Sequence, residues 1–222
     1  MRSNSLKHQQ ETVMIPEIKT TASFDIDAQK GFTPICPEEL PVPKGDTIAE
    51  ALNRQAKHAS IRIGSKDWHS MNAVWIADEN NPQFTPVKGK NVDIRWNAHC
   101  IAGTKGSEFL DPLPHPSEYD FFVWKGMEID MHPYGACYHD LDEKLSTGVI
   151  EFLKIQGIKT IIAGGLATDY CVKTTAIQLR NAGFNVIVNL EACKGIADDT
   201  TEKAIDDMKK AGINVIDSLE LL

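Results

Sequence analysis

The sequence predicts an α/β protein built as a three-layer sandwich, with a mainly parallel six-stranded sheet between layers of helices. In the second half of the chain, short apolar segments alternate with amphipathic ones across brief connections, as strands and crossover helices of a parallel sheet do. Polar residues directly follow several of the apolar segments, at positions where such sheets form their binding sites. The 222 residues, 42% of them hydrophobic, can form a large core.

The expected elements follow from apolar periodicity and from turn residues. Strands are expected at 21–27, 60–65, 119–124, 158–163, 184–190 and 213–216. Helices are expected after Asp46 and at 145–156, 169–182 and 199–210, the last three being followed by Gly157, Gly183 and Gly212. Glycine at that position commonly ends a helix because it adopts the left-handed conformation at low cost.

Residues 1–20 are predicted to be a polar extension, partly disordered at its start, ahead of a single domain spanning 21–222. The extension has no apolar core and therefore does not resemble a secretory signal. Residues 31–44 form a proline-rich loop, and 68–118 is too long for a plain connection. This second segment contains three of the four tryptophans, so we expect it to form the wall of a binding site.

The composition argues against several kinds of partner. A net charge of −8 and a pI near 5.4 do not suit nucleic acid or an anionic membrane surface, which select for basic patches. No apolar stretch is long enough to span a bilayer. The five cysteines are scattered with no CxxC pair, which favours free thiols and a cytoplasmic location. A homo-oligomer is left open.

Cys171 follows an apolar segment that ends in Gly164-Gly165 and a short turn. Thr168 is expected to cap the next helix, which puts Cys171 in the first helical turn. The partial positive charge of a helix start stabilises a thiolate, the nucleophilic form of cysteine. For an isolated cysteine, burial as a small hydrophobic residue is the more common alternative.

Two more residues at predicted strand ends accompany this cysteine. Asp27 and Lys125 follow the first and third strands, and the carboxyl ends of parallel strands face one crevice. A carboxylate, a lysine and a cysteine that converge there suit acyl transfer, in which the thiol attacks a carbonyl and a base takes its proton.

A second pattern indicates a metal site. Asp67 and His69 are two residues apart on an extended segment, so both side chains point the same way, and His99 could supply a third ligand. Two histidines and one carboxylate suit Zn²⁺, Fe²⁺ or Mn²⁺. A surface aspartate and a half-buried histidine explain the Asp-x-His pattern equally well.

Taken together, the motifs resemble those of nicotinamidases, members of the isochorismatase-like cysteine hydrolase superfamily. The resemblance runs from about residue 21 to the C-terminus and rests on short motifs that occur in the family's order. These are Asp27-x-Gln29 with Phe32, Asp67-Trp68-His69, Trp96-x-x-His99-Cys100-x-x-Gly103-Thr104-x-Gly106-x-Glu108, Lys125-Gly126 and Gly165-Leu166-Ala167-Thr168-Asp169-Tyr170-Cys171-Val172.

The resemblance implies the isochorismatase-like hydrolase fold and the conversion of nicotinamide to nicotinate and ammonia, a step of NAD salvage. By matching positions, Asp27 is the general base, Lys125 lowers the thiol pKa and orients Asp27, and Cys171 forms a thioester. A cis bond between Leu166 and Ala167 is implied, with an oxyanion hole formed by the N–H groups of Ala167 and Cys171. The matching metal ligands are Asp67, His69 and His99, with Zn²⁺ the first candidate, and the matching substrate-binding residues are Phe32, Trp96, Leu166 and Tyr134.

The chain departs from the family in two places. Ser70 follows the Asp-Trp-His motif and 71–76 contains no second histidine. If there is a fourth protein ligand, Asp78 or Glu79 could supply it. The segment after Lys125 reads His132-Pro133-Tyr134-Gly135-Ala136-Cys137, and we expect His132 and Cys137 to be changes in packing rather than pocket residues.

Two rival functions remain open. One is hydrolysis of another small amide, such as a maleamate or a ureido compound, which would keep the triad without needing the metal ligands or Trp96. The other is a non-catalytic α/β binding protein that uses the fold as a scaffold. Dinucleotide binding is disfavoured because no GxGxxG follows the first strand.

Overall fold

The computed structural model describes residues 16–221 and contains one six-stranded sheet, all of whose strands are parallel. The strand order is β3-β2-β1-β4-β5-β6. The strands span Thr21–Ile26 (β1), Ile61–Asp67 (β2), Phe121–Lys125 (β3), Thr160–Leu166 (β4), Asn185–Lys194 (β5) and Asn214–Ile216 (β6). The predicted fold class is confirmed.

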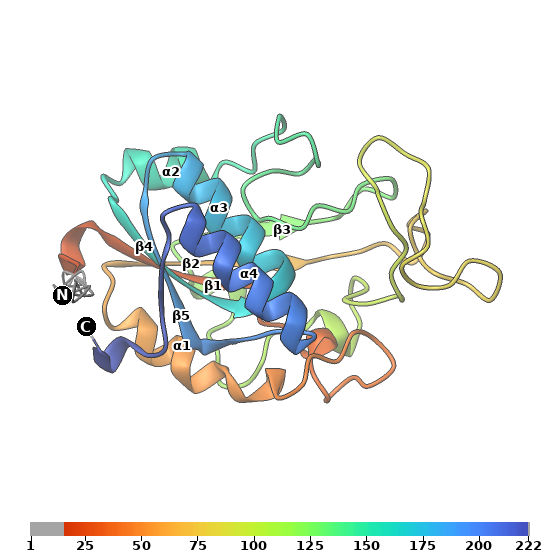
Figure 1. The fold of residues 1–222 in the computed structure, drawn as a ribbon, viewed down its shortest axis with the longest axis horizontal. Helices are drawn as coiled ribbons and strands as arrows, with labels where there is room; N and C mark the ends of the chain where they lie inside the picture. Colours follow the sequence, from red (N-terminus) through yellow and green to blue (C-terminus); the bar gives the residue numbers. More distant parts are fainter. Residues whose placement is uncertain (1–15, 222) are drawn as a thin grey trace, which may run out of the picture.

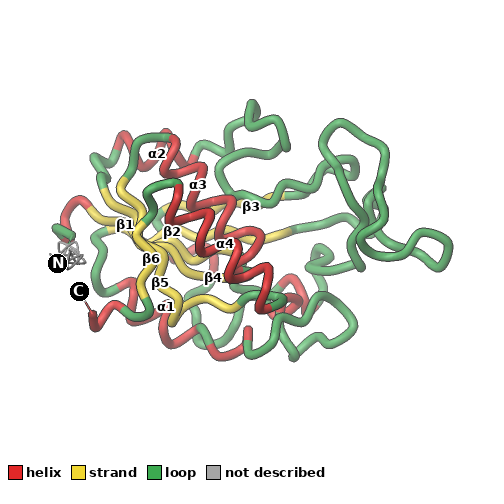
Figure 2. Tube along the Cα trace, in the orientation of Figure 1, coloured by secondary structure: helices red, strands yellow, loops and turns green. Residues whose placement is uncertain are grey.

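Helices cover both faces of the sheet (Figures 1 and 2). Helix α1 (Ala49–Ala56) packs on one face, and α2 (Val149–Ile155), α3 (Lys173–Asn181) and α4 (Asp198–Lys210) pack on the other. Alternation along β4 explains this arrangement, because Ile161 and Ala163 join the core beneath α2–α4 whereas Ile162 points to the opposite face.

Three element boundaries differ from those expected. The helix expected at 145–156 begins only at Val149, because Gly148 has a φ of +87° and interrupts the pattern. Thr168 is not a helix cap: a five-residue π-helical turn, Thr168–Val172, precedes α3, and no side chain caps it. Strand β5 runs on to Lys194, past a register shift opposite Ala163 and Gly165.

The chain order creates a switch point between the two central strands. From β1 the chain proceeds through β2 and β3 toward one edge, and then returns to β4 on the other side of β1. Parallel sheets bind ligands at the carboxyl ends of the strands beside such a point. The two strands approach closely there, since a Cβ on Gly165 would come within 1.9 Å of the Ile26 carbonyl oxygen. Only glycine fits at this position.

Long loops extend beyond the carboxyl ends of the strands. The loops that directly follow β2 reach the far right of Figure 1 and those that follow β3 lie in its upper centre, while the described ends of the chain lie on the left. Figure 2 shows these two segments largely as loop and turn. Among the residues that the structure describes, no helix has both the length and the apolar character needed to cross a membrane.

Candidate active site

Three buried side chains with acid–base chemistry meet at the carboxyl ends of β1, β3 and β4. The Nζ atom of Lys125 lies 3.0 Å from Asp27 Oδ2 and 3.8 Å from Cys171 Sγ. The side chains of Asp27 and Lys125 are fully excluded from solvent, and Cys171 is 7% exposed. The fold therefore brings together the aspartate, lysine and cysteine that the sequence indicated, from positions as far apart as 27 and 171.

Burial dominates the electrostatics of this group. Desolvation raises the pKa of the Cys171 thiol well above its ordinary value of 9.0, against the opposing effect of Lys125, and it also raises the pKa of Asp27 above 3.8. Burial alone would lower the pKa of Lys125, but the two neighbouring carboxylates raise it well above 10.5. Lys125 is therefore a permanent cation at pH 7, and Cys171 keeps its proton at rest. The thiolate expected from the helix start is outweighed by desolvation.

A hydrogen bond from strand β2 holds the Asp27 carboxylate in place. Its Oδ1 accepts a hydrogen bond of 2.7 Å from the hydroxyl of Ser65, and its backbone has a φ of +46°. That left-handed conformation is uncommon for residues other than glycine, and such residues concentrate at functional sites. Asp27 thus turns its carboxylate toward Lys125 instead of continuing strand β1.

Gln29 ties the end of β1 to the end of β2. Its side-chain oxygen accepts from the Asp67 N–H at 2.7 Å, and its Nε2 donates to the Asp67 carbonyl at 2.8 Å and to the Ser107 carbonyl at 3.2 Å. The side chain is completely buried, where unmade hydrogen bonds are costly. This glutamine, part of the Asp27-x-Gln29 motif, positions the backbone of Asp67.

Asp67 links the lysine to a cluster of histidines. One carboxylate oxygen accepts a hydrogen bond from Lys125, and the other lies 3.5 Å from His69 Nε2 and 4.0 Å from His99 Nε2. Burial would raise the pKa of Asp67, but Lys125 and His69 outweigh it and hold that pKa below its ordinary value. The carboxylate is therefore charged and faces both imidazoles.

The two histidines present the same ring nitrogen to Asp67. Nδ1 of His69 lies 2.9 Å from the Gly126 carbonyl, and Nδ1 of His99 lies 2.7 Å from the Asn97 carbonyl. A carbonyl can only accept, so Nδ1 carries a proton in each ring and Nε2 is the nitrogen that can offer a lone pair to a metal. Gly126 permits this close approach, since a Cβ there would lie 2.2 Å from the His69 ring. Metal-binding histidines are commonly oriented by such a bond from the second nitrogen.

These donors fit a divalent cation. The Nε2 atom of His69 is buried and has no hydrogen-bond partner among the described residues. Ligands that each lie about 2.1 Å from one Zn²⁺ can be no more than about 4.2 Å apart, and both Asp67–histidine distances are below that limit. Burial lowers the pKa of His99 to about 3, so that ring is neutral at pH 7, as a metal ligand must be.

His132 lies in the same cluster, contrary to the expectation that it is only a packing change. Potential ligand atoms of His69, His99 and His132 all lie within 4.8 Å of one another. His132 lies in the irregular loop after β3, where no helical or strand periodicity in the sequence indicates which side chains point inward. The sequence contained one indirect clue, namely a histidine missing after His69 and an additional one at 132. Cys137, in contrast, is fully buried in the main core, as expected.

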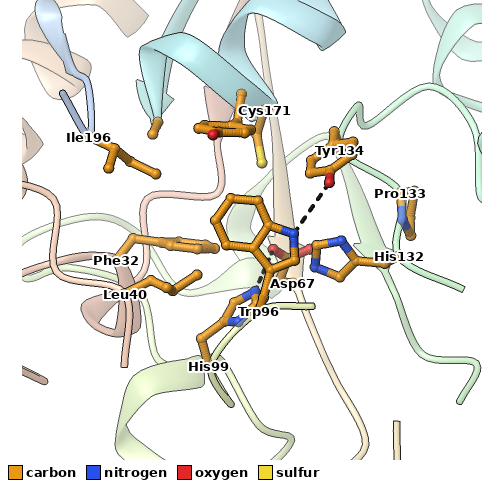
Figure 3. Close-up of a pocket in the computed structure, with 12 residues that line it drawn as sticks. Phe32, Leu40, Asp67, Trp96, His99, His132, Pro133, Tyr134, Cys171 and Ile196 are labelled. Carbon is orange, nitrogen blue, oxygen red and sulfur yellow. Dashed lines mark hydrogen bonds and ion pairs between the residues drawn. The ribbon is translucent and has the colours of Figure 1, made fainter. Parts of the chain in front are cut away.

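An aromatic pocket opens above these groups (Figure 3). Phe32 and Trp96 line it, and the sulfur of Cys171 points into it from the opposite side. The Trp96 indole N–H donates to the Tyr134 hydroxyl oxygen at 3.2 Å, and that hydroxyl donates to the Asp93 carboxylate at 2.9 Å. A flat ring with a polar substituent is the kind of ligand that such walls suit.

Of the other residues predicted for the site, some line the pocket and others lie away from it. Ala167 lines the pocket, the Leu166–Ala167 peptide bond is cis, and the Ala167 N–H donates no hydrogen bond to another described residue. The Leu166 side chain is fully buried in the core and does not line the pocket. Asp78 is on an outer loop, where its carboxylate accepts from the N–H groups of Asn80 and Asn81. Pocket residues that the sequence did not single out are Leu40, Pro133, Tyr170 and Ile196.

The chain matches a known family over most of its length. The family model described as isochorismatase domain covers residues 21–220. A nicotinamidase of Acinetobacter baylyi is 31% identical over 201 residues, which is 89% of this chain and 92% of that protein. A nicotinamidase of Escherichia coli is 30% identical over 71% of this chain and 76% of its own length.

Solved structures agree with this match. The nicotinamidase/pyrazinamidase of Acinetobacter baumanii superposes with a TM-score of 0.83 at 32% identity, covering 92% of this chain and 99% of that one. A pyrazinamidase of Pyrococcus horikoshii, solved in complex with zinc, gives a TM-score of 0.72 at 28% identity over 89% and 98% of the two chains.

Proposed function

The chain belongs to the isochorismatase family and within it to the nicotinamidases, and on this premise we propose that it hydrolyses nicotinamide to nicotinate and ammonia. One observation carries the proposal: a buried lysine lies 3.0 Å from Asp27 and 3.8 Å from the Cys171 sulfur at the base of an aromatic pocket. A thiol, a base and a fixed cation are the groups that acyl transfer from an amide requires.

In the first half of the reaction, the pyridine ring binds between Phe32 and Trp96 with its carboxamide toward Cys171. Asp27 takes the thiol proton, and the sulfur attacks the amide carbon. The N–H groups of Ala167 and Cys171 hold the developing oxyanion, an interaction whose loss costs about 3 kcal/mol of barrier in other hydrolases. Leu166 contributes to this oxyanion hole through its main chain, because its carbonyl group forms the peptide bond that carries the Ala167 N–H.

The high pKa of the thiol is compatible with this role. Because burial keeps Cys171 protonated, proton transfer to Asp27 has to accompany the attack. Lys125 stays charged and stabilises both the Asp27 carboxylate and the thiolate as it forms. Asp27 then delivers the proton to the departing nitrogen, and ammonia leaves a nicotinoyl thioester on Cys171.

In the second half, water hydrolyses the thioester. Asp27, again a carboxylate, takes a proton from the water as the oxygen attacks the thioester carbon. The carbon–sulfur bond breaks, the sulfur regains a proton from Asp27, and nicotinate is released. Lys125 keeps its charge throughout, so a single base serves both halves of the reaction.

We assign Asp67, His69 and His99 as ligands of one divalent ion, with Zn²⁺ the first candidate and Fe²⁺ or Mn²⁺ the alternatives. The free Nε2 of His69 and the charged carboxylate between the two rings support the assignment. When bound there, the ion supplies a Lewis acid for the ring nitrogen of the substrate. A cytoplasmic enzyme of NAD salvage is in keeping with five cysteines that are all free thiols.

Ammonia release from nicotinamide tests the proposal directly. Cys171→Ala should lose about 10⁴-fold or more in kcat, as removal of a catalytic nucleophile does in other hydrolases. Cys193→Ala is the matched control, since Cys193 is also buried but does not line the pocket. Full activity of Cys171→Ala, or no turnover of nicotinamide by the wild type, would refute the assignment.

A second comparison separates nicotinamide from other small amides. Benzamide has the same shape without the ring nitrogen, so it should be a much poorer substrate if the histidine cluster serves ring recognition. Maleamate represents the rival class that needs the triad alone. Faster turnover of maleamate than of nicotinamide would favour that rival.

A further inference from the structure

His132 is a buried imidazole with no hydrogen bonds to compensate its burial. It is 5% exposed, and neither Nδ1 nor Nε2 has a hydrogen-bond partner among residues 16–221. Each unsatisfied buried polar atom costs about 1–3 kcal/mol. A histidine that served only packing would be unfavourable here compared with an apolar residue of similar size.

The surroundings of His132 leave few places for either nitrogen to find a partner. Its ring stacks on His69 with 5.3 Å between centroids, and the Trp75 ring lies 4.3 Å away. Trp75 is fully buried and also contacts the rings of His69 and His99, at 4.6 and 5.2 Å. The indole N–H of Trp75 is itself committed to the Met131 carbonyl. The three imidazoles therefore pack against one indole ring, which offers none of them a hydrogen-bond partner.

The three rings nevertheless converge. The potential ligand atoms of the three rings all lie within 4.8 Å of one another. One point therefore lies within about 2.8 Å of all three atoms, which is less than about 1 Å longer than a Zn–N bond of 2.0–2.1 Å. The charged carboxylate of Asp67 lies beside two of these rings.

We propose that His132 is a ligand of the same divalent ion as Asp67, His69 and His99, so that the site contains three imidazoles and one carboxylate. The inference rests on the metal site of the proposed function and adds a ligand from a different part of the chain. It replaces Asp78, whose carboxylate is used by the turn at Asn80 and Asn81.

A third imidazole changes which metal the site prefers. Imidazole nitrogen suits Zn²⁺ and Fe²⁺, whereas Mn²⁺ and Mg²⁺ are better matched by carboxylates and water. The wild type should therefore favour Zn²⁺ over Mn²⁺ more strongly than a variant that lacks the His132 ring. A ring fixed by the loop after β3 also couples that loop to the metal.

The experiment measures metal binding rather than turnover. Metal-free wild type, His132→Ala and the control Asp78→Asn are titrated with Zn²⁺ in competition with a chromophoric chelator. A group that only hydrogen-bonds to a metal ligand typically contributes 10–100-fold to the metal affinity. Because His132 is proposed to bind the metal directly, the Zn²⁺ affinity of His132→Ala should fall by about 100-fold or more. Asp78→Asn should stay within about 3-fold, because its residue is exposed and outside the cluster.

X-ray absorption at the zinc edge of the wild type counts the imidazoles without any substitution, and thus does not depend on how well His132→Ala folds. Three imidazoles support the proposal. Two imidazoles, or a Zn²⁺ affinity of His132→Ala within about 3-fold of the wild type, would overturn it while leaving the other three ligands in place. No Zn²⁺ binding by the wild type would instead refute the metal site of the proposed function.

Discussion

Replacing Lys125 with methionine tests whether this buried lysine is the electrostatic centre of the site. Its ammonium lies 3.0 Å from Asp27 Oδ2 and also donates to Asp67. At an effective dielectric constant of about 20, two unit charges 3.0 Å apart attract by about 5.5 kcal/mol. Lys125→Met removes that attraction and leaves two carboxylates buried without a cation, which typically destabilises a protein by about 3–5 kcal/mol.

A double-mutant cycle with Asp27→Asn isolates the pair. When Lys125 is lost, Asp27 can take up a proton, and this limits the cost. The coupling energy should therefore fall below the Coulomb figure, to about 2–4 kcal/mol, within the range of close charge pairs. Urea denaturation of the four metal-free proteins at pH 7 gives the unfolding free energies.

Lys66→Met is the matched control for this cycle. Lys66 is 5% exposed on the neighbouring strand β2, but it lies over the rings of Trp68 and Trp124 instead of beside a carboxylate of residues 16–221. Its coupling with Asp27→Asn should be near zero. If the Lys125–Asp27 coupling were below about 1 kcal/mol, the electrostatic account of the site would be wrong.

Three further outcomes are expected. Burial raises the pKa of Asp27 above 3.8, and activity is lost as the pH falls through that pKa because the base becomes protonated. The acid limb of kcat/KM should therefore lie above pH 3.8, and an acid limb at or below 3.8 in a pH–rate profile would contradict this. Gln29→Leu should lower the unfolding free energy by about 1–3 kcal/mol for each Asp67 main-chain group left unpaired, measured in urea; an unchanged midpoint would rule out its positioning role. Tyr134→Phe should raise KM for nicotinamide about 2- to 10-fold with little change in kcat, because the hydroxyl that accepts the Trp96 indole N–H is lost. An equal loss in kcat would show that the hydroxyl acts in the chemical step instead.

The alternation of apolar and amphipathic segments was sufficient to predict the parallel sheet and its helices. All six strands occur close to the expected positions. Burial on both faces favours apolar runs that are visible locally, as in β4. Helix starts were less predictable. Thr168 suits a cap by residue type, yet the backbone after Leu166 makes a π-helical turn there, and no side chain caps it.

The sequence predicted part of the site because its residues follow predicted strands. Asp27, Lys125 and Cys171 each follow a strand, and the parallel arrangement by itself directs strand ends to one edge. Distances, protonation and burial required the assembled structure, because each depends on groups from distant segments. Desolvation, for example, raises the pKa of Cys171 whereas a helix start would lower it.

Local pattern and residue type thus determined the fold class, the strand-end residues and the Asp67-x-His69 pair, because each of these depends on neighbours in the chain. Tertiary structure alone decided that His132 joins the histidine cluster and that Leu166 enters the core. Both residues are placed by long-range packing, His132 against Trp75 and Leu166 beneath α1, and packing between distant segments leaves no periodic trace in the sequence.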